Sequence, residues 1–113
     1  MEFVNRCAVL VKPRLPYLEW MASVSRRPEA ESSFQDSIDD PDVYLLPEHD
    51  DPGRALRKVW KDIFHQELVA WNTDSSSWPQ KRNYQMFKEW FELVLCSTVL
   101  DSGKGPILCD DFL

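Results

Sequence analysis

Glycine is scarce in this 113-residue chain and its cysteines lack a pairing or metal-ligand pattern, and each of these features argues against a class of function. The chain has only three glycines, and none of them belongs to a glycine-rich loop of the kind that cradles phosphates. The three cysteines, Cys7, Cys96 and Cys109, show no metal-ligand spacing, and an odd number does not suit a fully paired secreted scaffold. We therefore expect free thiols in a reducing cytoplasm.

Long apolar runs and excess positive charge are also missing. The apolar run near the N-terminus extends only from Cys7 to Val11, which is too short for a signal-peptide core or a membrane span. Lys and Arg total 13 against 19 Asp and Glu, and the formal net charge is −6. Binding to a phosphate backbone relies on Lys and Arg. We expect a cytoplasmic, acidic protein that binds neither nucleic acid nor membrane.

The chain does contain enough apolar material for one core. Hydrophobic residues make up 43% of it, including five Trp, six Phe and three Tyr, and charged residues make up 28%. A domain of about this length buries roughly two thirds of the surface of its unfolded chain. We predict one domain over residues 1–113, with a mobile acidic loop at about 25–42, where Pro, Ser and acidic residues dominate.

Hydrophobic periodicity places the first elements. The continuous apolar run Cys7–Val11 predicts a strand that is buried on both faces, and Val43–Leu46 predicts a second short strand. Pro16 suits the first turn of a helix that ends near residue 23 or 25. The strongest signal is an amphipathic helix from about Pro52 to Ala70. Its apolar positions recur at three- and four-residue steps: Leu56, Val59, Trp60, Ile63, Phe64, Leu68 and Trp71.

The C-terminal half is less regular. We expect Asn72 to end the long helix in a left-handed turn. Asn83 is a suitable N-cap for a second helix that begins at Tyr84. Residues 92–100 could continue that helix, but their β-branched content favours a third strand. The tail is expected to add a short edge segment or to pack Ile107 and Phe112 against the body.

This order of elements predicts the fold class. Strand, helix, strand, helix, helix and strand indicate a small α+β domain, a two-layer sandwich with a short sheet of about three strands covered by about three helices.

The cluster of Glu48, His49, Asp50 and Asp51 before Pro52 has two readings. Carboxylates and imidazole are metal ligands, but side chains of adjacent residues usually point in different directions. Asp51 suits the N-cap of the long helix, and Asp50 complements the positive end of its dipole. Glu48, His49 and Asp50 are therefore weak metal candidates, and we assign neither a metal nor a cofactor.

No set of residues indicates catalysis. His65 falls on the polar side of the long helix, without an identifiable base or nucleophile as partner. Cys7 and Cys96 lie in apolar runs and are expected to be buried and inert, whereas Cys109 is expected to be exposed. We assign no catalytic residue.

Aromatic and basic residues provide the candidate contact surface. The clustered aromatic residues, among them Trp60, Trp71, Trp78 and Trp90, are expected mainly to form the core. The alternative is a partly exposed aromatic patch at Trp78, which falls outside both apolar stripes and precedes Pro79, as an aromatic side chain at a contact site would. Basic residues follow one side of the long helix and the segment after Trp78, an asymmetry that can steer an acidic partner. The predicted partner-binding residues are Trp78, Arg57, Lys61, Lys81 and Arg82.

Three segments carry a resemblance to known proteins. They are RCAVLVKPRLPYLEW, VYLLPE and VWKDIFHQELVAWNTDSSSWPQKRNYQMFKEWFEL, which together span most of the chain apart from the acidic loop and the tail. In these segments the chain resembles a family of short bacterial proteins known only as uncharacterised, a domain of unknown function. The resemblance implies a compact cytoplasmic domain and gives no residue a role.

Two functions follow as hypotheses. The first is a small cytoplasmic protein-binding domain, interacting or regulatory and without catalytic activity, whose partner is another protein or a second copy of the chain. The alternative is an enzyme or a protein that binds a small ligand or a metal, with an unrecognised site near Glu48, His49 and Trp78. A pocket with a perturbed titratable group would favour the alternative.

Overall fold

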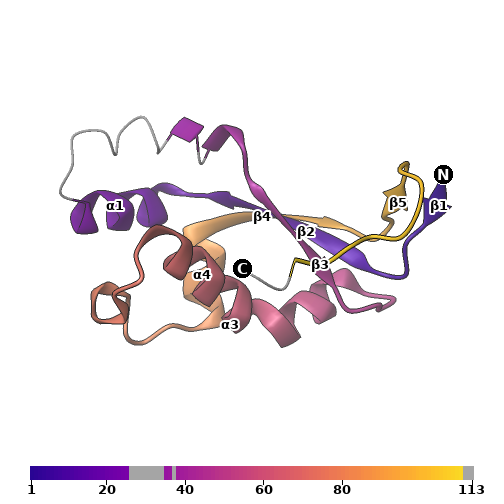
Figure 1. Cartoon of the computed structure of the whole chain (residues 1–113). Coiled ribbons are helices and arrows are strands. Elements are labelled where there is room, and N and C mark those ends of the chain that lie inside the picture. The colour runs from indigo at the N-terminus through magenta and orange to yellow at the C-terminus, as the bar shows by residue number, and fades with distance from the viewer. Residues whose placement is uncertain (26–34, 37, 111–113) are drawn as a thin grey trace.

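The computed structural model describes residues 1–25, 35–36 and 38–110 (Figure 1). In these residues three α-helices and five strands confirm the predicted α+β class. In chain order the elements are β1 (Glu2–Phe3), β2 (Cys7–Pro13), α1 (Leu15–Val24), β3 (Asp42–Leu46), α3 (Pro52–Trp71), the 3-10 helix η1 (Ser75–Ser77), α4 (Tyr84–Trp90), β4 (Phe91–Cys96) and β5 (Leu100–Asp101).

A three-stranded antiparallel sheet of order β3-β2-β4 forms one layer. Helix α3 contacts all three of its strands, and Figure 1 shows α3 and α4 together on one side of the sheet. The short strands β1 and β5 pair with each other at one end of the molecule, with Phe3 opposite Leu100. Sequence reasoning missed this second sheet, since strands of two residues are too short to show alternation.

The sheet has an inner face toward the helices and an outer face. Side chains alternate along a strand, so Cys7, Val9 and Val11 of β2 point to one face, and all three are fully buried in the core with residues of α3. Residues paired across an antiparallel sheet share a face. Val9 is paired with Tyr44 of β3 and with Leu95 of β4, which places these residues on the inner face too.

Helix α3 forms where the sequence predicts it and presents its apolar stripe to the sheet. Ile63, Phe64 and Leu68 are buried, and Trp60 is half-buried. The Asp51 side chain accepts a hydrogen bond from the Gly53 N–H, which confirms the predicted N-cap. The helix end differs from the prediction. Asn72 has φ −146° and lies in the extended region, because the chain runs straight on toward η1 instead of reversing.

Helix α4 passes directly into β4. The Asn83 side chain caps α4 by accepting a hydrogen bond from the Met86 N–H, as predicted. Phe91 is extended and begins β4, so the predicted third strand is confirmed and the continued helix is not. The Arg14 N–H donates to the Trp90 carbonyl and so joins the start of α1 to the end of α4.

Aromatic side chains fill the space between the layers. Phe64 lies 5.7 Å from Phe87 and 5.5 Å from Phe91 between ring centroids, and Tyr17 of α1 lies 4.9 Å from Phe91. These separations suit offset and edge-to-face contacts, which add to the energy of apolar burial. The predicted aromatic core is present.

Several predictions about the periphery need correction or stay open. Cys96 is exposed and not buried, because its side chain points to the outer face of the sheet beside Ala8. Ile107 is 58% exposed and is not part of the core, and Phe112 lies outside the described residues. Most of the predicted mobile loop at about 25–42 lies outside the described residues. None of the helices within the described ranges combines the length and the apolar character that a membrane crossing requires.

Candidate functional site

A carboxylate interrupts the buried stripe of α3. Glu67 is only 8% exposed and lies four residues from both Ile63 and Trp71, on the helix face that packs against the sheet. Acidic side chains are almost never fully buried unless they are paired. Sequence reasoning missed Glu67, although its position within the apolar spacing of the helix was a signal that could have revealed it.

Two tyrosines hold Glu67 in place. The Tyr44 hydroxyl donates a hydrogen bond to Glu67 Oε2, and the Tyr17 hydroxyl donates to the Glu67 main-chain oxygen at 2.7 Å. Asp42 precedes Tyr44 by two residues on β3, so both side chains point to the inner face, toward α3. Three elements, α1, β3 and α3, thus meet at one glutamate.

The surroundings of Glu67 favour its protonated form. Burial raises the pKa of Glu67 from 4.5 to about 8, and the hydrogen bond and negative charge of Asp42 act in the same direction. The hydrogen bond from Tyr44 opposes them by stabilising the carboxylate. Burial, followed by the charge of Glu67, also raises the pKa of Tyr17. At neutral pH the site therefore holds a proton that an exposed glutamate would have lost.

A small cavity of about 130 Å³ opens beside this carboxyl group. Its walls combine aliphatic and aromatic groups with acidic side chains from β2, α1, the segment before β3, and α3: Val11, Pro13, Tyr17, Asp40, Pro41, Asp42, Glu67, Ala70 and Trp71. A carboxyl group that is protonated at neutral pH can donate a hydrogen bond, and once ionised it can accept one from a bound group. A pocket with a perturbed titratable group is the feature that favours the small-ligand alternative, but this pocket lies at Glu67 and not near Glu48, His49 and Trp78.

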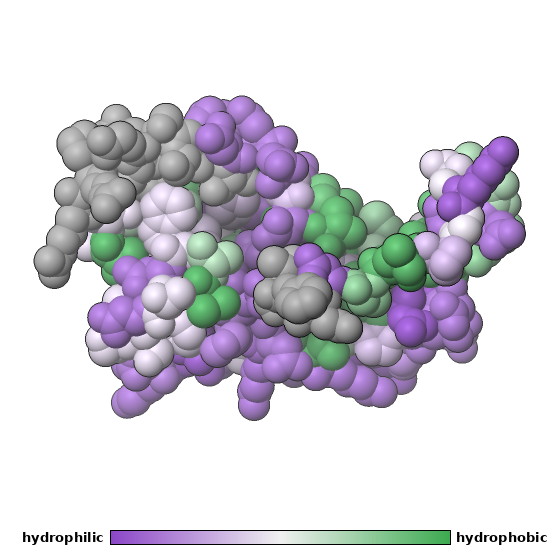
Figure 2. All heavy atoms as spheres, viewed as in Figure 1, coloured by the Kyte–Doolittle hydropathy of each residue, from purple (hydrophilic) through white to green (hydrophobic). Residues whose placement is uncertain are grey.

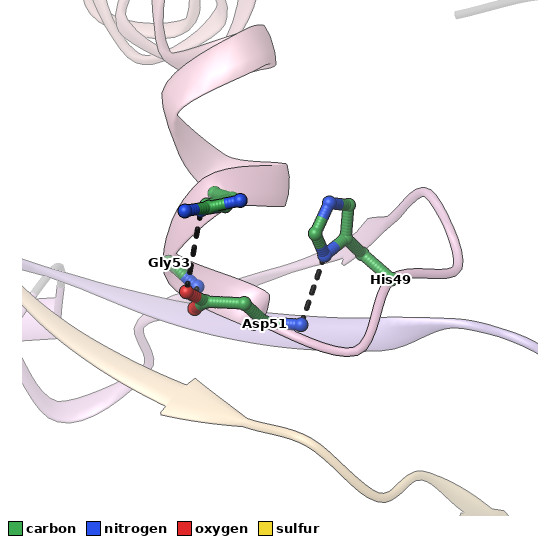
Figure 3. A network of polar contacts seen from close by, with 4 residues as sticks. His49, Asp51 and Gly53 are labelled. Carbon is green, nitrogen blue, oxygen red and sulfur yellow. Dashed lines mark hydrogen bonds and ion pairs between the residues drawn. The ribbon is translucent and has the colours of Figure 1, made fainter.

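The acidic cluster before α3 is a helix start (Figure 3). His49 Nδ1 accepts a hydrogen bond from the Asp51 N–H at 2.9 Å, and Arg54 lies 3.9 Å from the Asp51 carboxylate. Glu48 and Asp50 are both exposed at this turn. Nowhere in the described part of the chain do three or more His, Cys, Asp or Glu side chains gather in an arrangement that could hold a metal ion.

Trp78 is buried, which overturns its prediction as an exposed contact residue. It is 8% exposed, its indole N–H donates to the Asn72 carbonyl at 2.8 Å, and the exposed His65 ring packs edge-on against it at 5.1 Å. The cause is the 3-10 turn η1, which folds Trp78 back onto α3; periodicity within one helix cannot show such a contact. His49 precedes the start of α3, about 20 Å along the helix axis from His65. His49 and Trp78 therefore do not converge on one site.

The basic residues predicted to bind a partner lie along aromatic side chains. The guanidinium of Arg57 lies 4.9 Å from the Tyr84 ring centroid, close enough for a cation-π interaction. Lys61 and Arg82 line one hollow of about 210 Å³ with Trp60 and Gln80. Lys81 is exposed. The structure thus brings Lys61 and Arg82 together on the solvent-facing side of α3 and places Trp78 beneath them as part of the core.

The outer face of the three-stranded sheet is apolar. Pairing aligns two rows across it, one made by Leu45, Ala8 and Cys96 and the other by Val43, Leu10 and Val94. On the two edge strands Val43 is 62% exposed, Leu45 50% and Val94 39%. Figure 2 shows hydrophobic atoms at the surface in the region where the strands and the C-terminal tail overlap in the view. In an antiparallel sheet with one face in solvent, alternation along each strand usually places polar residues on that face. The two rows on this outer face hold apolar side chains and cysteine instead.

In the described residues these features define a small two-layer α+β domain with a buried carboxyl site and an apolar outer sheet face whose edge residues Val43, Leu45 and Val94 are exposed. Comparison with known proteins adds no relative: no family model matches the chain, and no curated protein or solved structure is significantly similar to it. The resemblance to a family of short bacterial proteins therefore stays a prediction.

Proposed function

We propose that the protein is a small protein-binding domain that docks a partner protein on the outer face of its three-stranded sheet. The observation that carries the proposal is the pair of apolar rows, with Val43, Leu45 and Val94 exposed on β3 and β4. A sheet buries an apolar face against a second layer. In the described residues α3 and α4 cover only the inner face, so a partner would supply the missing layer.

Strand composition supports this choice of surface. Monomeric soluble proteins rarely expose a contiguous apolar patch without a function for it. The central strand β2 is apolar at successive positions from Cys7 to Val11, which is typical of a strand covered on both faces. At one end of the outer face Lys12 is paired with Glu92, which gives an apolar patch a polar border, as is common in protein interfaces.

Charge indicates a partner other than a second copy. Each chain carries a net charge of −6, and two such chains repel each other. The basic residues Lys61 and Arg82 lie on the solvent-facing side of α3, away from the outer sheet face, so they would not offset the repulsion between two copies that met through their sheets. A neutral or basic partner protein fits better.

Free thiols support a cytoplasmic location for this function. Cys7, Cys96 and Cys109 are all unpaired, and Cys96 and Cys109 are exposed. Exposed thiols persist in a reducing compartment and tend to oxidise outside it.

Matched surface variants test the docking face. Val43→Lys with Leu45→Lys places two charges on the apolar rows at a sheet edge, where lysine is well tolerated. Lys61→Glu with Lys81→Glu changes two exposed residues on the basic side instead. Both pairs are exposed, so each single substitution should change the free energy of unfolding by roughly 0.5 kcal/mol or less. Affinity capture from extracts of the cells that make the protein, followed by mass spectrometry, compares the proteins that each variant retains.

The expected result is a protein captured by the wild type and by the Lys61→Glu, Lys81→Glu variant but lost with the Val43→Lys, Leu45→Lys variant. A captured protein that depends on Lys61 and Lys81 and not on the sheet would place the interface on the basic side and refute the proposal. A set of captured proteins that is identical for all three chains would refute docking on either surface.

A further inference from the structure

The cavity beside Glu67 is separate from the proposed docking face, because it lies on the inner side of the sheet. Tyr17 and Trp71 supply aromatic walls, and Val11, Pro13, Pro41 and Ala70 supply aliphatic ones. Among the lining residues that the structure describes, Asp40, Asp42 and Glu67 carry carboxyl groups, and none is Lys, Arg or His. A site of this composition repels anions and attracts cations.

Glu67 has hydrogen-bond partners but no basic partner. Tyr44 and Asp42 of β3 and Tyr17 of α1 face it, Asp40 lies in the same cavity, and β2 contributes only Val11 and Pro13 to the lining. Across the described ranges no Lys or Arg forms an ion pair with Glu67. A buried carboxylate is strongly disfavoured without an opposite charge nearby. Glu67 therefore keeps its proton.

We propose that this cavity binds the ammonium or guanidinium group of a small organic cation. Carboxylates of Glu67 and Asp42 would accept charge-assisted hydrogen bonds from its N–H groups. The rings of Tyr17 and Trp71 would contact its charge through cation-π interactions. The volume of about 130 Å³ suits such a small group and is well below the roughly 300–1,000 Å³ of cavities that hold drug-sized ligands.

Binding of the cation releases a proton. The ligand's positive charge takes the place of the proton on Glu67, and that proton passes to the solvent. Since the pKa of Glu67 is about 8, roughly a tenth of the molecules carry the ionised form at pH 7 and roughly nine tenths at pH 9. Apparent affinity for the cation is proportional to the fraction of molecules in which Glu67 is ionised, so it should rise about tenfold from pH 7 to pH 9.

Calorimetric titration of the full chain with methylguanidinium chloride tests the proposal, because this probe keeps its charge from pH 7 to pH 9. We expect saturable binding, about tenfold tighter at pH 9, with a shift of the Trp71 indole N–H signal in NMR spectra. Glu67→Gln retains the volume and a hydrogen-bond acceptor for Tyr44, and it should weaken binding at pH 9 at least tenfold and remove the pH dependence. Asp62→Asn removes one exposed carboxylate from the same helix and should leave binding unchanged.

Two results would overturn the proposal. Absence of saturable binding to the folded wild type at pH 9 is the first. The second is an equal effect of Glu67→Gln and Asp62→Asn, which would mean that the acidic surface attracts the probe without a specific site. Thermal unfolding of each variant confirms that the compared chains are folded, and Asp42→Asn provides an independent change of the same site if Glu67→Gln does not fold.

Discussion

Burial of Glu67 makes the stability of this protein depend on pH in an unusual direction. The folded state holds the proton up to a pKa of about 8, whereas the unfolded chain releases it near 4.5. Between these values the folded state binds more protons, so stability falls as pH rises. The contribution of this proton to the free energy of unfolding is fully present below pH 4.5 and is lost above about pH 8.

The magnitude follows from the gap between the two pKa values. About 3.5 pH units at about 1.4 kcal/mol per unit correspond to a loss of about 5 kcal/mol over the whole range. From pH 5.5 to pH 7.5 the expected loss is about 2 to 3 kcal/mol. Glu67→Gln removes the titrating group and should remove this part of the pH dependence.

Urea unfolding followed by tryptophan fluorescence at pH 5.5, 6.5 and 7.5 measures the effect for both chains. The free energy of unfolding is plotted against pH for each chain. The difference between the two slopes isolates the effect of Glu67, because His49, His65 and the other acids are present in both chains. Parallel stability profiles for the wild type and Glu67→Gln would refute the reasoning, since they would mean that Glu67 titrates alike in the folded and unfolded states.

Four further predictions concern the core, a cap and the thiols. Phe64→Ala should lower the free energy of unfolding by about 3 to 5 kcal/mol, because the side chain is fully buried; a loss under about 1 kcal/mol in urea would mean that the helix face is wrongly assigned. Trp78→Ala should cost a similar amount, and unchanged stability would place Trp78 outside the core. Asn83→Ala should cost about 1 kcal/mol in thermal unfolding through loss of the α4 cap, and an unchanged midpoint would argue against that cap. Iodoacetamide should label the exposed Cys96 well before the buried Cys7 in peptide mass spectra; equal rates would contradict their assigned burial.

Much of the fold is visible in the sequence, because local patterns determine it. The apolar run of β2, the stripe of α3, and the caps Asp51 and Asn83 are each set by residues within a few positions of one another. The strand β4 was predictable only in part, because of the β-branched residues Val94, Thr98 and Val99 in the segment 92–100 only Val94 lies within Phe91–Cys96. Strands β1 and β5 were not predictable, because they are short and pair across most of the chain length.

Errors arose where distant segments meet. Trp78 is covered by contacts with α3 that depend on the turn η1, so its position in a polar connection gave no sign of burial. Cys96 lies in an apolar run, but its face of the sheet is uncovered. Glu67, Tyr44 and Tyr17 come from three separate elements, and only their packing creates the carboxyl site.

The direct test of the proposed docking face is a photo-crosslinking amino acid in place of Val43, compared with the same group in place of the exposed Lys58 on α3, in living cells. Docking on the outer sheet face predicts one discrete adduct with a different protein from position 43 and no such adduct from position 58. No adduct at position 43, or an adduct with the mass of two copies of this chain, would contradict it.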